Sequence, residues 1–305
     1  MPDATEDTLR NTPDLWRSAL IDAGPEAHKY QRGSALVWSG PPLATGASRL
    51  AAIAALRAGA GVVTLAGDAA ALAVHAAHVT AIMLKPARNA AGLPRLVEET
   101  RASACVLGPA MGAGAPARRL IETALRLNIA CVLDADALTS FAGQSAALGK
   151  SIARTTAPVV LTPHEGEFAR LMGREHSFSA TQPRLSRARD AARMLRATVV
   201  LKGSRTVIAA ADGRAAVNDN APPWLATAGS GDVLAGVIGG LLAQGMPDFE
   251  AACAGVWLHG LAGAFAGRGM IADDLAVAVS QAVRSLWDDV TAASTRPPPR
   301  ASPRP

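Results

Sequence analysis

Short apolar runs alternate with longer amphipathic or alanine-rich stretches along most of the chain. The short runs are mostly apolar and do not alternate with polar residues, which is typical of parallel strands buried on both faces of a sheet. They predict strands at residues 35–38, 62–65, 81–84, 104–107, 129–133, 159–161 and 198–201. Helical patterns separate most of these strands, and Leu50, Ile53 and Leu56 mark the apolar face of the first helix. Repeated βα units of this kind predict an α/β fold with a central, mostly parallel sheet and helices on both faces.

The last third of the chain adds a hairpin and three apolar helices. Residues 205–210 and 214–217 flank Asp212-Gly213, a dipeptide that favours the tight turn of a β-hairpin. The apolar patterns that follow predict helices at about 231–244, 248–266 and 272–287.

The two ends of the chain differ in composition from the part between them. Residues 1–12 are polar and lack periodicity, and residues 291–305 are rich in proline and arginine. Such segments bury too little apolar surface to fold, so we expect both to be disordered. No linker interrupts the part between them, and we predict a single domain over residues 13–290.

Composition agrees with this fold class and limits the possible partners. Hydrophobic residues make up 50% of the 305 residues but aromatic residues only 4%, which suits close helix-on-sheet packing better than an all-β sandwich. The net charge is +5, yet no basic run with interleaved aromatic residues appears. We therefore expect no nucleic-acid partner, although the charge is compatible with anionic small ligands.

Cysteine usage and apolar run lengths predict the compartment. Cys105, Cys131 and Cys253 each lie in an apolar stretch, and none has a CxxC partner or a histidine at metal-binding spacing. We expect buried thiols in a reducing compartment. The N-terminus lacks a basic-then-apolar signal pattern, and on the sequence no apolar stretch approaches the roughly 18 residues of a spanning helix. These features predict a soluble, cytoplasmic protein without a membrane partner.

The run ATAGSGDVLAG at residues 226–236 joins a glycine turn to an apolar helix. Gly229 and Gly231 allow the backbone to approach a ligand closely, so that amide groups and the helix N-terminus can converge on an anion. Asp232 stands at the junction, where a carboxylate beside phosphate is useful if it takes a proton from an attacking hydroxyl. An ordinary capped helix after a glycine turn is the alternative interpretation of this run alone.

Two further segments place polar groups just after predicted strands, where ligands bind in open α/β sheets. His164 follows the strand at 159–161 and could donate to or stack on a ligand, although a loop histidine without function fits the pattern equally well. Glu165 and Glu167 suit the N-terminal dipole of the next helix. The run KGSRT at 202–206 offers a cation and hydroxyl donors to a nucleotide, although a lysine at a strand end is usually solvated.

Nine segments in order resemble the ADP-dependent NAD(P)H-hydrate dehydratases, the C-terminal YjeF-type family of the ribokinase-like superfamily. The segments are HKYQRG (28–33), TGA (45–47), AALRAGAG (54–61), GPAMG (108–112), DADAL (134–138), TPHEGE (162–167), KGSRT (202–206), AGSGD (228–232) and WLHGLAG (257–263). The resemblance extends from about His28 to about Ala278 and implies a ribokinase-like fold. It also implies repair of the S epimer of hydrated NADH or NADPH, with AMP and phosphate as the other products.

The resemblance assigns roles to residues of this chain. It assigns the nucleotide to Lys202, Gly203, Ser204, Arg205, Thr206 and Gly231, with the amides around Gly229 and Ser230 facing the transferring phosphoryl group. It assigns the hydrated dinucleotide to Ala47, Gly112, His164 and Asp232, and Asp232 is the expected catalytic base. ADP is the expected phosphoryl donor, and Mg²⁺ is expected with it, although no dedicated set of metal ligands is identifiable.

Three polar residues near these segments have simpler explanations. Asp134 and Asp136 follow a buried strand and could orient groups in the site, but capping of the next helix explains them equally well. His259 lies among apolar residues of a helix, where a buried, hydrogen-bonded core histidine is expected.

The chain departs from the family pattern in two places. Ala110 stands where the family usually has glycine, so its Cβ is expected to crowd the dinucleotide or shift the loop. Pro41 and Pro42 stiffen a loop that is expected to close on substrate. The family often follows an epimerase domain, for which this chain has no room, so we expect a separate epimerase. We also expect a homo-oligomer, a tetramer by the resemblance.

Two other functions remain open on the sequence. A small-molecule kinase of the same superfamily, acting on a sugar or vitamin alcohol, uses the same turn and aspartate. A nucleotide-binding module without turnover is the other, although the intact GSGD at 229–232 argues against it. The sequence does not decide between ADP and ATP, or between the hydrates of NADH and NADPH.

Overall fold

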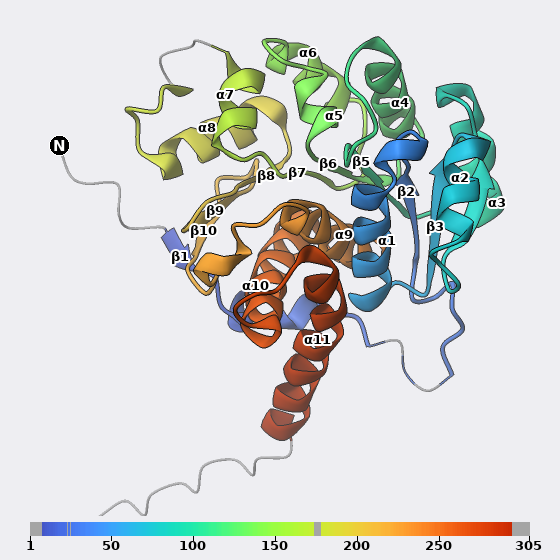
Figure 1. Ribbon diagram of the computed structural model, residues 1–305. Helices are drawn as coiled ribbons and strands as arrows, with labels where there is room; N and C mark the ends of the chain where they lie inside the picture. Colours follow the sequence, from blue (N-terminus) through green and yellow to red (C-terminus); the bar gives the residue numbers. More distant parts are fainter. Residues whose placement is uncertain (1–7, 23, 25, 174–177, 295–305) are drawn as a thin grey trace, which may run out of the picture.

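The computed structural model describes residues 8–22, 24, 26–173 and 178–294, and these contain one ten-stranded sheet (Figure 1). The strand order is β1-β10-β9-β8-β7-β6-β5-β2-β3-β4. The strands are β1 (Thr8–Arg10), β2 (Ser34–Trp38), β3 (Val62–Gly67), β4 (Met83–Pro86), β5 (Ala104–Leu107), β6 (Ala130–Leu133), β7 (Val159–Leu161), β8 (Thr198–Leu201), β9 (Thr206–Ala209) and β10 (Ala215–Asn218). Strands β2 to β8 pair with one another in parallel, and β9 is antiparallel to both β8 and β10. The predicted mostly parallel sheet is confirmed.

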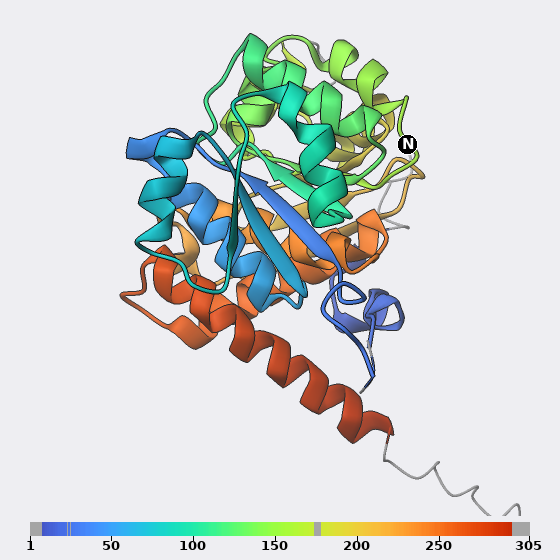
Figure 2. The same ribbon diagram turned by 90° about the vertical axis from the view of Figure 1, so that its right-hand side faces the viewer.

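Helices cover both faces of this sheet, as Figures 1 and 2 show. One layer holds α1 (Gly46–Arg57), α9 (Ser230–Ala243), α10 (Asp248–Ala266) and α11 (Ala272–Ser294), which pack against one another and bury one large apolar core against the sheet. The other face carries a second core under α3 (Leu93–Thr100), α4 (Ala115–Arg126), α5 (Asp136–Thr139), α6 (Ser145–Ile152), α7 (Glu165–Met172) and α8 (Arg184–Leu195). The short α2 (Ala69–Ala76) packs beside β3 and β4.

Helices α1 and α9 lie unusually close because the sequence supplies glycine at their contact. A Cβ on Gly236 would collide with the carbonyl of Ala51, and a Cβ on Gly240 would meet the carbonyl of Ala55. This close packing sets the N-termini of both helices beside each other at one edge of the sheet, where a ligand could contact both.

The ends of the domain differ from the sequence prediction. Thr8–Arg10 form an edge strand parallel to β10, although residues 1–12 were expected to be disordered. The free backbone groups along the outer edge of β10 explain this pairing, because composition says nothing about an available sheet edge. Helix α11 continues to Ser294, four residues into the predicted tail, while residues 1–7 and 295–305 lie outside the described residues. Strand β4 begins at Met83, two residues later than predicted.

One helix of the described residues is long and apolar enough to cross a membrane, so the expectation that no apolar stretch reaches that length is wrong. This helix is α10, with 19 residues. However, 67% of its most apolar window is buried within the fold, as in the core helix of a globular domain.

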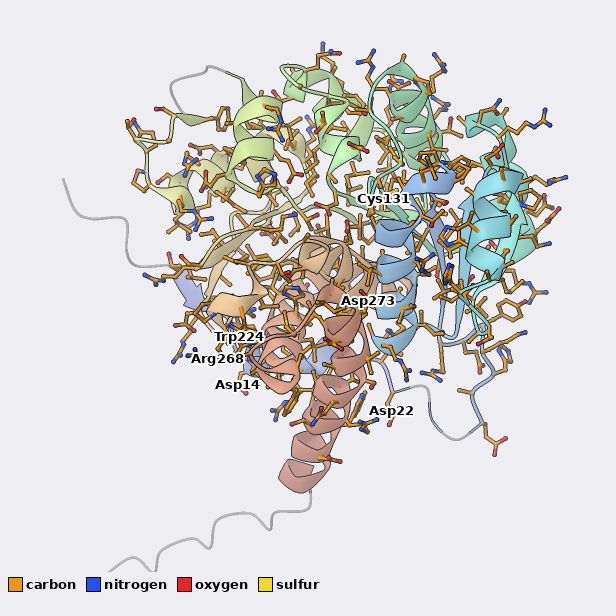
Figure 3. All side chains as sticks on the ribbon, viewed as in Figure 1. Asp14, Asp22, Cys131, Trp224, Arg268 and Asp273 are labelled. Atoms are coloured by element: carbon orange, nitrogen blue, oxygen red, sulfur yellow. The ribbon has the colours of Figure 1, made fainter. Side chains whose placement is uncertain are left out.

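The three cysteines are buried and free, as predicted. Cys105 and Cys131 lie opposite each other on β5 and β6 with their sulfur atoms 3.9 Å apart, and Figure 3 labels Cys131.

Candidate active site

The glycine turn is shaped by helices from three parts of the chain. Gly229 has a φ of 86°, and a Cβ there would lie 2.7 Å from Ala272 Cβ and 2.9 Å from Leu50 Cδ1. Helix α9 begins at Ser230, and the amides of Gly231 and Asp232 make no hydrogen bond to any described residue. Free amides at a helix N-terminus attract an anion, because their N–H dipoles and the helix dipole point the same way.

The loop before this turn is fastened to α10. The indole of Trp224 donates a hydrogen bond of 2.8 Å to the carbonyl of Gly263, and the guanidinium of Arg268 lies 5.5 Å from the centre of the Trp224 ring (Figure 3). A fixed loop matters here, since the amides of the glycine turn can bind an anion only while they stay aligned.

His259 supports the turn from beneath. Its Nε2 lies 2.9 Å from the carbonyl oxygen of Ser230 and 3.1 Å from the Ser230 hydroxyl. Burial lowers the pKa of His259 to about 4, although the Ser230 carbonyl opposes this, so the ring is neutral at pH 7. The prediction of a buried, hydrogen-bonded histidine is confirmed. His259 is also within hydrogen-bonding distance of the Ser230 hydroxyl.

Asp232 lies in the first turn of α9 as a carboxylate with no hydrogen-bond or ion-pair partner among the described residues. Burial is the main cause that raises its pKa, to about 6, and the negative charge of Asp134 adds to the increase. The positive charge of Lys202 works in the opposite direction. A free carboxylate with a pKa near the operating pH is suited to act as a general base.

Lys202 is the central cation of the site. Its Nζ donates a hydrogen bond of 2.9 Å to Asp134 Oδ1 and lies 3.8 Å from Glu167 Oε2. Burial disfavours the ammonium, but the charges of Asp134 and Glu167 outweigh it and raise the Lys202 pKa, so the side chain stays charged. A Cβ added to Gly231 would lie 3.2 Å from this Nζ, which places the cation directly beside the glycine turn.

The turn that carries Lys202 is held by Arg184 of α8. The guanidinium of Arg184 donates to the carbonyls of Leu201, Lys202 and Arg205, at 3.1, 2.9 and 2.7 Å. It also donates to Glu165 Oε1 at 2.7 Å. A Cβ at Gly203 would lie 2.6 Å from this guanidinium, so a side chain there would have to displace Arg184.

His164 caps α7 and faces the same edge of the sheet. Its Nδ1 accepts hydrogen bonds from the amides of Gly166 and Glu167, at 3.0 and 3.4 Å. The Glu167 carboxylate in turn accepts from the His164 amide at 2.8 Å. The imidazole is half exposed, and its Nε2 is the ring nitrogen that remains available to a ligand, 3.5 Å from Glu167 Oε1.

The loop after β5 is tied to the end of β6. The amide of Gly112 donates to Asp136 Oδ2 at 2.9 Å, so Asp136 positions this loop and does not cap α5, whose N-cap is Ala135. Ala110 has a φ of 52°, in the left-handed region that favours glycine. The departure from glycine at this position therefore strains the backbone in addition to placing a Cβ there.

Ala135 shows the same strain more strongly, with a φ of 46° and a ψ of −112°. We expect Ala135→Gly to stabilise the fold by about 1 kcal/mol, because glycine adopts this conformation without the steric cost. The measurement is the free energy of unfolding in urea. Ala73→Gly in the exposed part of α2 is the matched control and is expected to destabilise by about 1 kcal/mol. A loss of stability in both variants would contradict the assignment of strain to Ala135.

Most of the expected site residues follow the carboxyl ends of parallel strands, with Ala47 after β2, Gly112 after β5, His164 after β7 and Lys202 after β8. Ala47 lies in the first turn of α1, one turn before Leu50, whose side chain borders Gly229. Ser204 and Arg205 are exposed at the rim, and the Thr206 hydroxyl is used within the turn, donating to the Gly203 carbonyl at 3.1 Å.

Several residues of the site were missed or assigned another role from the sequence. For Asp134 and Asp136 the sequence left open either a role in the site or capping of the next helix, and it explained Glu167 by the helix dipole. No sequence pattern pointed to Arg184, because it lies in a helix without a motif. Only the fold brings it to the turn that carries Lys202. For Asp134 and Asp136, the Asp-Ala-Asp run directly after a buried strand was the sequence pattern that could have pointed to the site.

The arrangement also bears on metal binding. No group of three or more His, Cys, Asp or Glu side chains within the described ranges is placed to hold a metal ion. The carboxylates of Asp134 and Glu167 already face the ammonium of Lys202.

Comparison with known proteins agrees with this geometry. A family model for NAD(P)H-hydrate dehydratase matches residues 35–283. An ADP-dependent (S)-NAD(P)H-hydrate dehydratase from Neisseria meningitidis is 38% identical over 87% of this chain and 88% of its own length. A bifunctional NAD(P)H-hydrate repair enzyme from Moorella thermoacetica is also 38% identical, over 90% of this chain. The chain spans only about half of that bifunctional relative, 53% of its length.

Solved structures share the whole fold. An ADP/ATP-dependent NAD(P)H-hydrate dehydratase from Bacillus subtilis, co-crystallised with ATP and Mg²⁺, superposes with a TM-score of 0.79 and 25% identity. The superposition covers 93% of this chain and 100% of that one. The ribokinase-like architecture implied by the sequence resemblance is thereby confirmed. With a matching family model over most of its length and a relative of similar extent, this chain belongs to the NAD(P)H-hydrate dehydratase family.

Proposed function

We propose that the protein restores NADH or NADPH from the S epimer of the hydrated cofactor, using ADP as phosphoryl donor and releasing AMP and phosphate. The observation that carries this proposal is the position of Asp232. It is a partly buried carboxylate without a partner, beside free amides at a helix N-terminus and a buried ammonium. A carboxylate that can accept the proton of a hydroxyl therefore lies beside amide and ammonium groups that can stabilise a phosphoryl group.

The reaction follows from these groups in two stages. In the first, Asp232 takes the proton of the ring hydroxyl, whose oxygen bonds to the β-phosphorus of ADP while the bond from that phosphorus to the bridging oxygen breaks. AMP leaves, and the ring carries a phosphate in place of its hydroxyl. In the second, the lone pair of the ring nitrogen expels phosphate, and loss of a proton from the adjacent ring carbon restores the double bond. Phosphorylation is needed because hydroxide is a far poorer leaving group than phosphate.

The nucleotide is proposed to lie between the glycine turn and the turn at residues 202–206. Lys202 and the amides of Gly231 and Asp232 would meet the phosphates, and Gly203, Ser204 and Arg205 would form the rim. Gly229 supplies the positive φ that the turn requires. The Ser230 hydroxyl is hydrogen-bonded with His259, so Ser230 is proposed to contribute through its place in the turn and not through its hydroxyl. The hydrated ring is assigned to the edge formed by Ala47, Gly112, His164 and Asp232.

Mg²⁺ is proposed to arrive on the phosphates of the nucleotide. It fits the chemistry of this edge, where oxygen ligands gather, but the carboxylates are partly neutralised by Lys202 and form no complete cage. Mg²⁺ usually binds through few carboxylates together with substrate phosphates. When bound, the ion would neutralise phosphate charge.

We expect kcat/KM to fall about tenfold per pH unit below pH 6 and to be level above it. The sign follows from the raised pKa of Asp232, about 6, since only the ionised carboxylate accepts a proton. Asp136→Asn is expected to move this acidic limb to lower pH, because the Asp136 charge contributes to the raised pKa. Glu98→Gln, an exposed change on α3, should leave the limb in place. A profile that is flat down to pH 5 would contradict Asp232 as the base.

The direct test incubates the protein with enzymatically prepared NADPH hydrate, ADP and Mg²⁺, and follows the absorbance of the reduced nicotinamide. Recovery of that absorbance with stoichiometric AMP supports the proposal. Phosphorylation of an alcohol by ATP without any recovery from the hydrate would favour a small-molecule kinase of the same fold. Parallel assays with ATP and with NADH hydrate determine the preferred donor and substrate.

Three further properties are proposed with the function. Because only one epimer is repaired, a separate epimerase activity would supply the S form from the R form. Exposed apolar side chains at Phe265, Ile271 and Val277 support a homo-oligomer, which we propose to be a tetramer. Three buried free thiols are compatible with a reducing cytoplasm. Light scattering during gel filtration tests the oligomeric state.

A further inference from the structure

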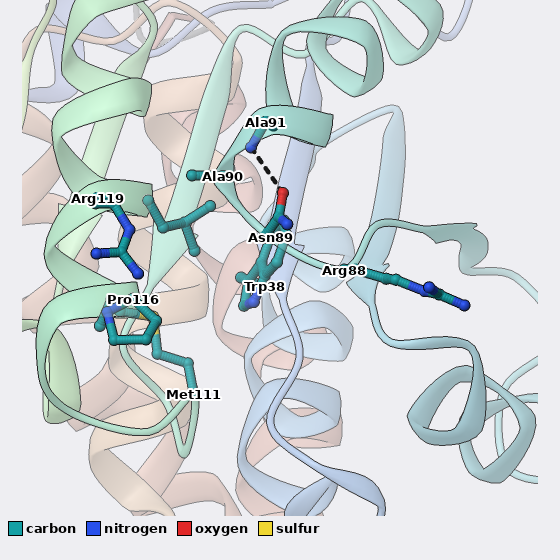
Figure 4. A pocket seen from close by; sticks show the side chains of 10 residues that line it. Trp38, Arg88, Asn89, Ala90, Ala91, Met111, Pro116 and Arg119 are labelled. Atoms are coloured by element: carbon teal, nitrogen blue, oxygen red, sulfur yellow. Dashed lines mark hydrogen bonds between the residues drawn. The ribbon is translucent and has the colours of Figure 1, made fainter.

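A cavity of about 410 Å³ lies on the α4 face of the sheet, between α4 and the short helix at Ala90–Gly92 (Figure 4). Its volume falls within the roughly 300–1,000 Å³ of small-molecule sites. Trp38, Asn89, Met111, Arg119 and Leu120 are among the residues that line it. None of the functional residues assigned above belongs to this lining, so the cavity is unexplained by the chemistry at Asp232.

The lining combines apolar surface with hydrogen-bond donors and has no carboxylate. Arg119 projects toward the space beside Pro116 and Met111 in Figure 4, and its guanidinium makes no ion pair or hydrogen bond to any described residue. The Asn89 side-chain oxygen accepts from the Ala91 amide at 3.0 Å, which leaves its NH₂ group to donate. The Trp38 indole supplies an aromatic face and a free N–H. Such a lining suits a ligand with a ring and a negative charge.

The cavity adjoins the proposed substrate edge. Met111 is the neighbour of Gly112, whose amide is bound to Asp136 at that edge. A Cβ on Gly40 would collide with the Ala110 carbonyl, so the loop after Trp38 and the loop that carries Met111 are in contact. A dinucleotide with its nicotinamide ring at Asp232 would therefore cross the Gly112 loop to place its other half in this cavity.

We infer that this cavity binds the adenosine end of the hydrated dinucleotide and that Arg119 pairs with its 2′-phosphate, which makes the hydrate of NADPH the preferred substrate. This inference rests on the proposed function. It differs from that function in naming the substrate form and a residue that selects it. A lone guanidinium selects for the extra phosphate because the charge-assisted hydrogen bonds exist only with the phosphorylated form.

A neighbouring hollow of about 400 Å³ adds to the positive field. It shares Arg88 and Asn89 with the first cavity and is also lined by Arg95. In Figure 4 the Arg88 guanidinium points away from Trp38 and Arg119, so Arg119 is the cation placed to contact a group inside the first cavity. Arg88 and Arg95 would attract the anion from outside, and their effect on selectivity is expected to be smaller.

The kinetic test compares NADPH hydrate with NADH hydrate in the full-length protein and in Arg119→Ala. We expect Arg119→Ala to lower kcat/KM for NADPH hydrate about tenfold through KM, with less than about a twofold change for NADH hydrate. Arg126→Ala is the matched control, because Arg126 is an exposed arginine on the same helix outside the cavity. It should leave kcat/KM unchanged for both substrates. Equal losses with both substrates, or no loss with either, would overturn the inference.

A binding measurement keeps this inference separate from the proposed function. Adenosine 2′,5′-bisphosphate is titrated calorimetrically into the protein in the presence of saturating AMP. Binding that weakens about tenfold in Arg119→Ala, and that recovers partly in Arg119→Lys, supports the cavity as the site. Absence of binding to the parent protein, or equal binding to Arg119→Ala, contradicts it. If neither hydrate is turned over by the parent protein, the proposed function fails, while the binding result still decides what the cavity takes.

Discussion

Replacing Asp232 with asparagine is expected to lower kcat by about a hundredfold to ten-thousandfold, the range for loss of a general base. Asparagine keeps the size of the side chain but cannot accept the proton of the ring hydroxyl, so the phosphoryl acceptor stays weak. Nucleotide affinity should change little, because the glycine turn, its free amides and Lys202 remain in place. The measurements are turnover of the hydrate with ADP and calorimetric binding of AMP.

The same substitution should make the protein more stable above pH 6. The folded state raises the pKa of Asp232 from its usual value near 4 to about 6, so the ionised carboxylate costs about 2 to 3 kcal/mol in the fold. This cost is absent below the unfolded pKa and complete once the pH exceeds the folded pKa. In urea at pH 8 the free energy of unfolding of Asp232→Asn should therefore exceed that of the parent protein. This difference should disappear toward pH 4.

The control for both effects is Asp273→Asn, which changes an exposed aspartate in the first turn of α11. It is expected to leave turnover and the pH dependence of stability unchanged. An Asp232→Asn variant as active as the parent would contradict the role of this carboxylate in the chemistry. A stability difference that does not depend on pH would contradict its burial as the cause of the raised pKa.

Lys202→Met is expected to be the most destabilising change in the site, by about 3 to 5 kcal/mol, because it leaves the buried carboxylates of Asp134 and Glu167 without their cation. It should also move the acidic limb of the pH profile to higher pH, since Lys202 lowers the pKa of Asp232. Weaker AMP binding is expected as well. The measurements are urea unfolding, the pH dependence of kcat/KM and calorimetry.

Two variants separate charge compensation from simple loss of packing. Adding Asp134→Asn to Lys202→Met removes one uncompensated carboxylate and should recover part of the lost stability. Lys150→Met, an exposed lysine in α6, should have little effect. If Lys202→Met is as stable as the parent, or if Asp134→Asn destabilises it further, the ion-pair account of Lys202 is wrong.

The fold was largely predictable because its signals are local. The parallel strands are mostly apolar, and the Asp212-Gly213 turn predicts the β9–β10 hairpin. Strand β1 was not predictable from composition, since its three residues form a strand only where the edge of β10 is free. The length of α10 was visible in the sequence, but its burial between neighbouring helices depends on the fold.

The sequence by itself determined the βα order, the glycine turn and the position of Asp232, because each depends on residues adjacent in the chain. Only the tertiary structure decided which charges share the site. Lys202 meets Asp134 across 68 positions of sequence, His259 supports Ser230 from another helix, and Arg184 holds the Lys202 turn from α8. The cavity at Arg119 likewise forms only where α4 and the segment at residues 88–91 come together beside Trp38 and Met111. Charge and burial act through space, so the pKa of Asp232 and the lining of the Arg119 cavity follow from packing that no local pattern contains.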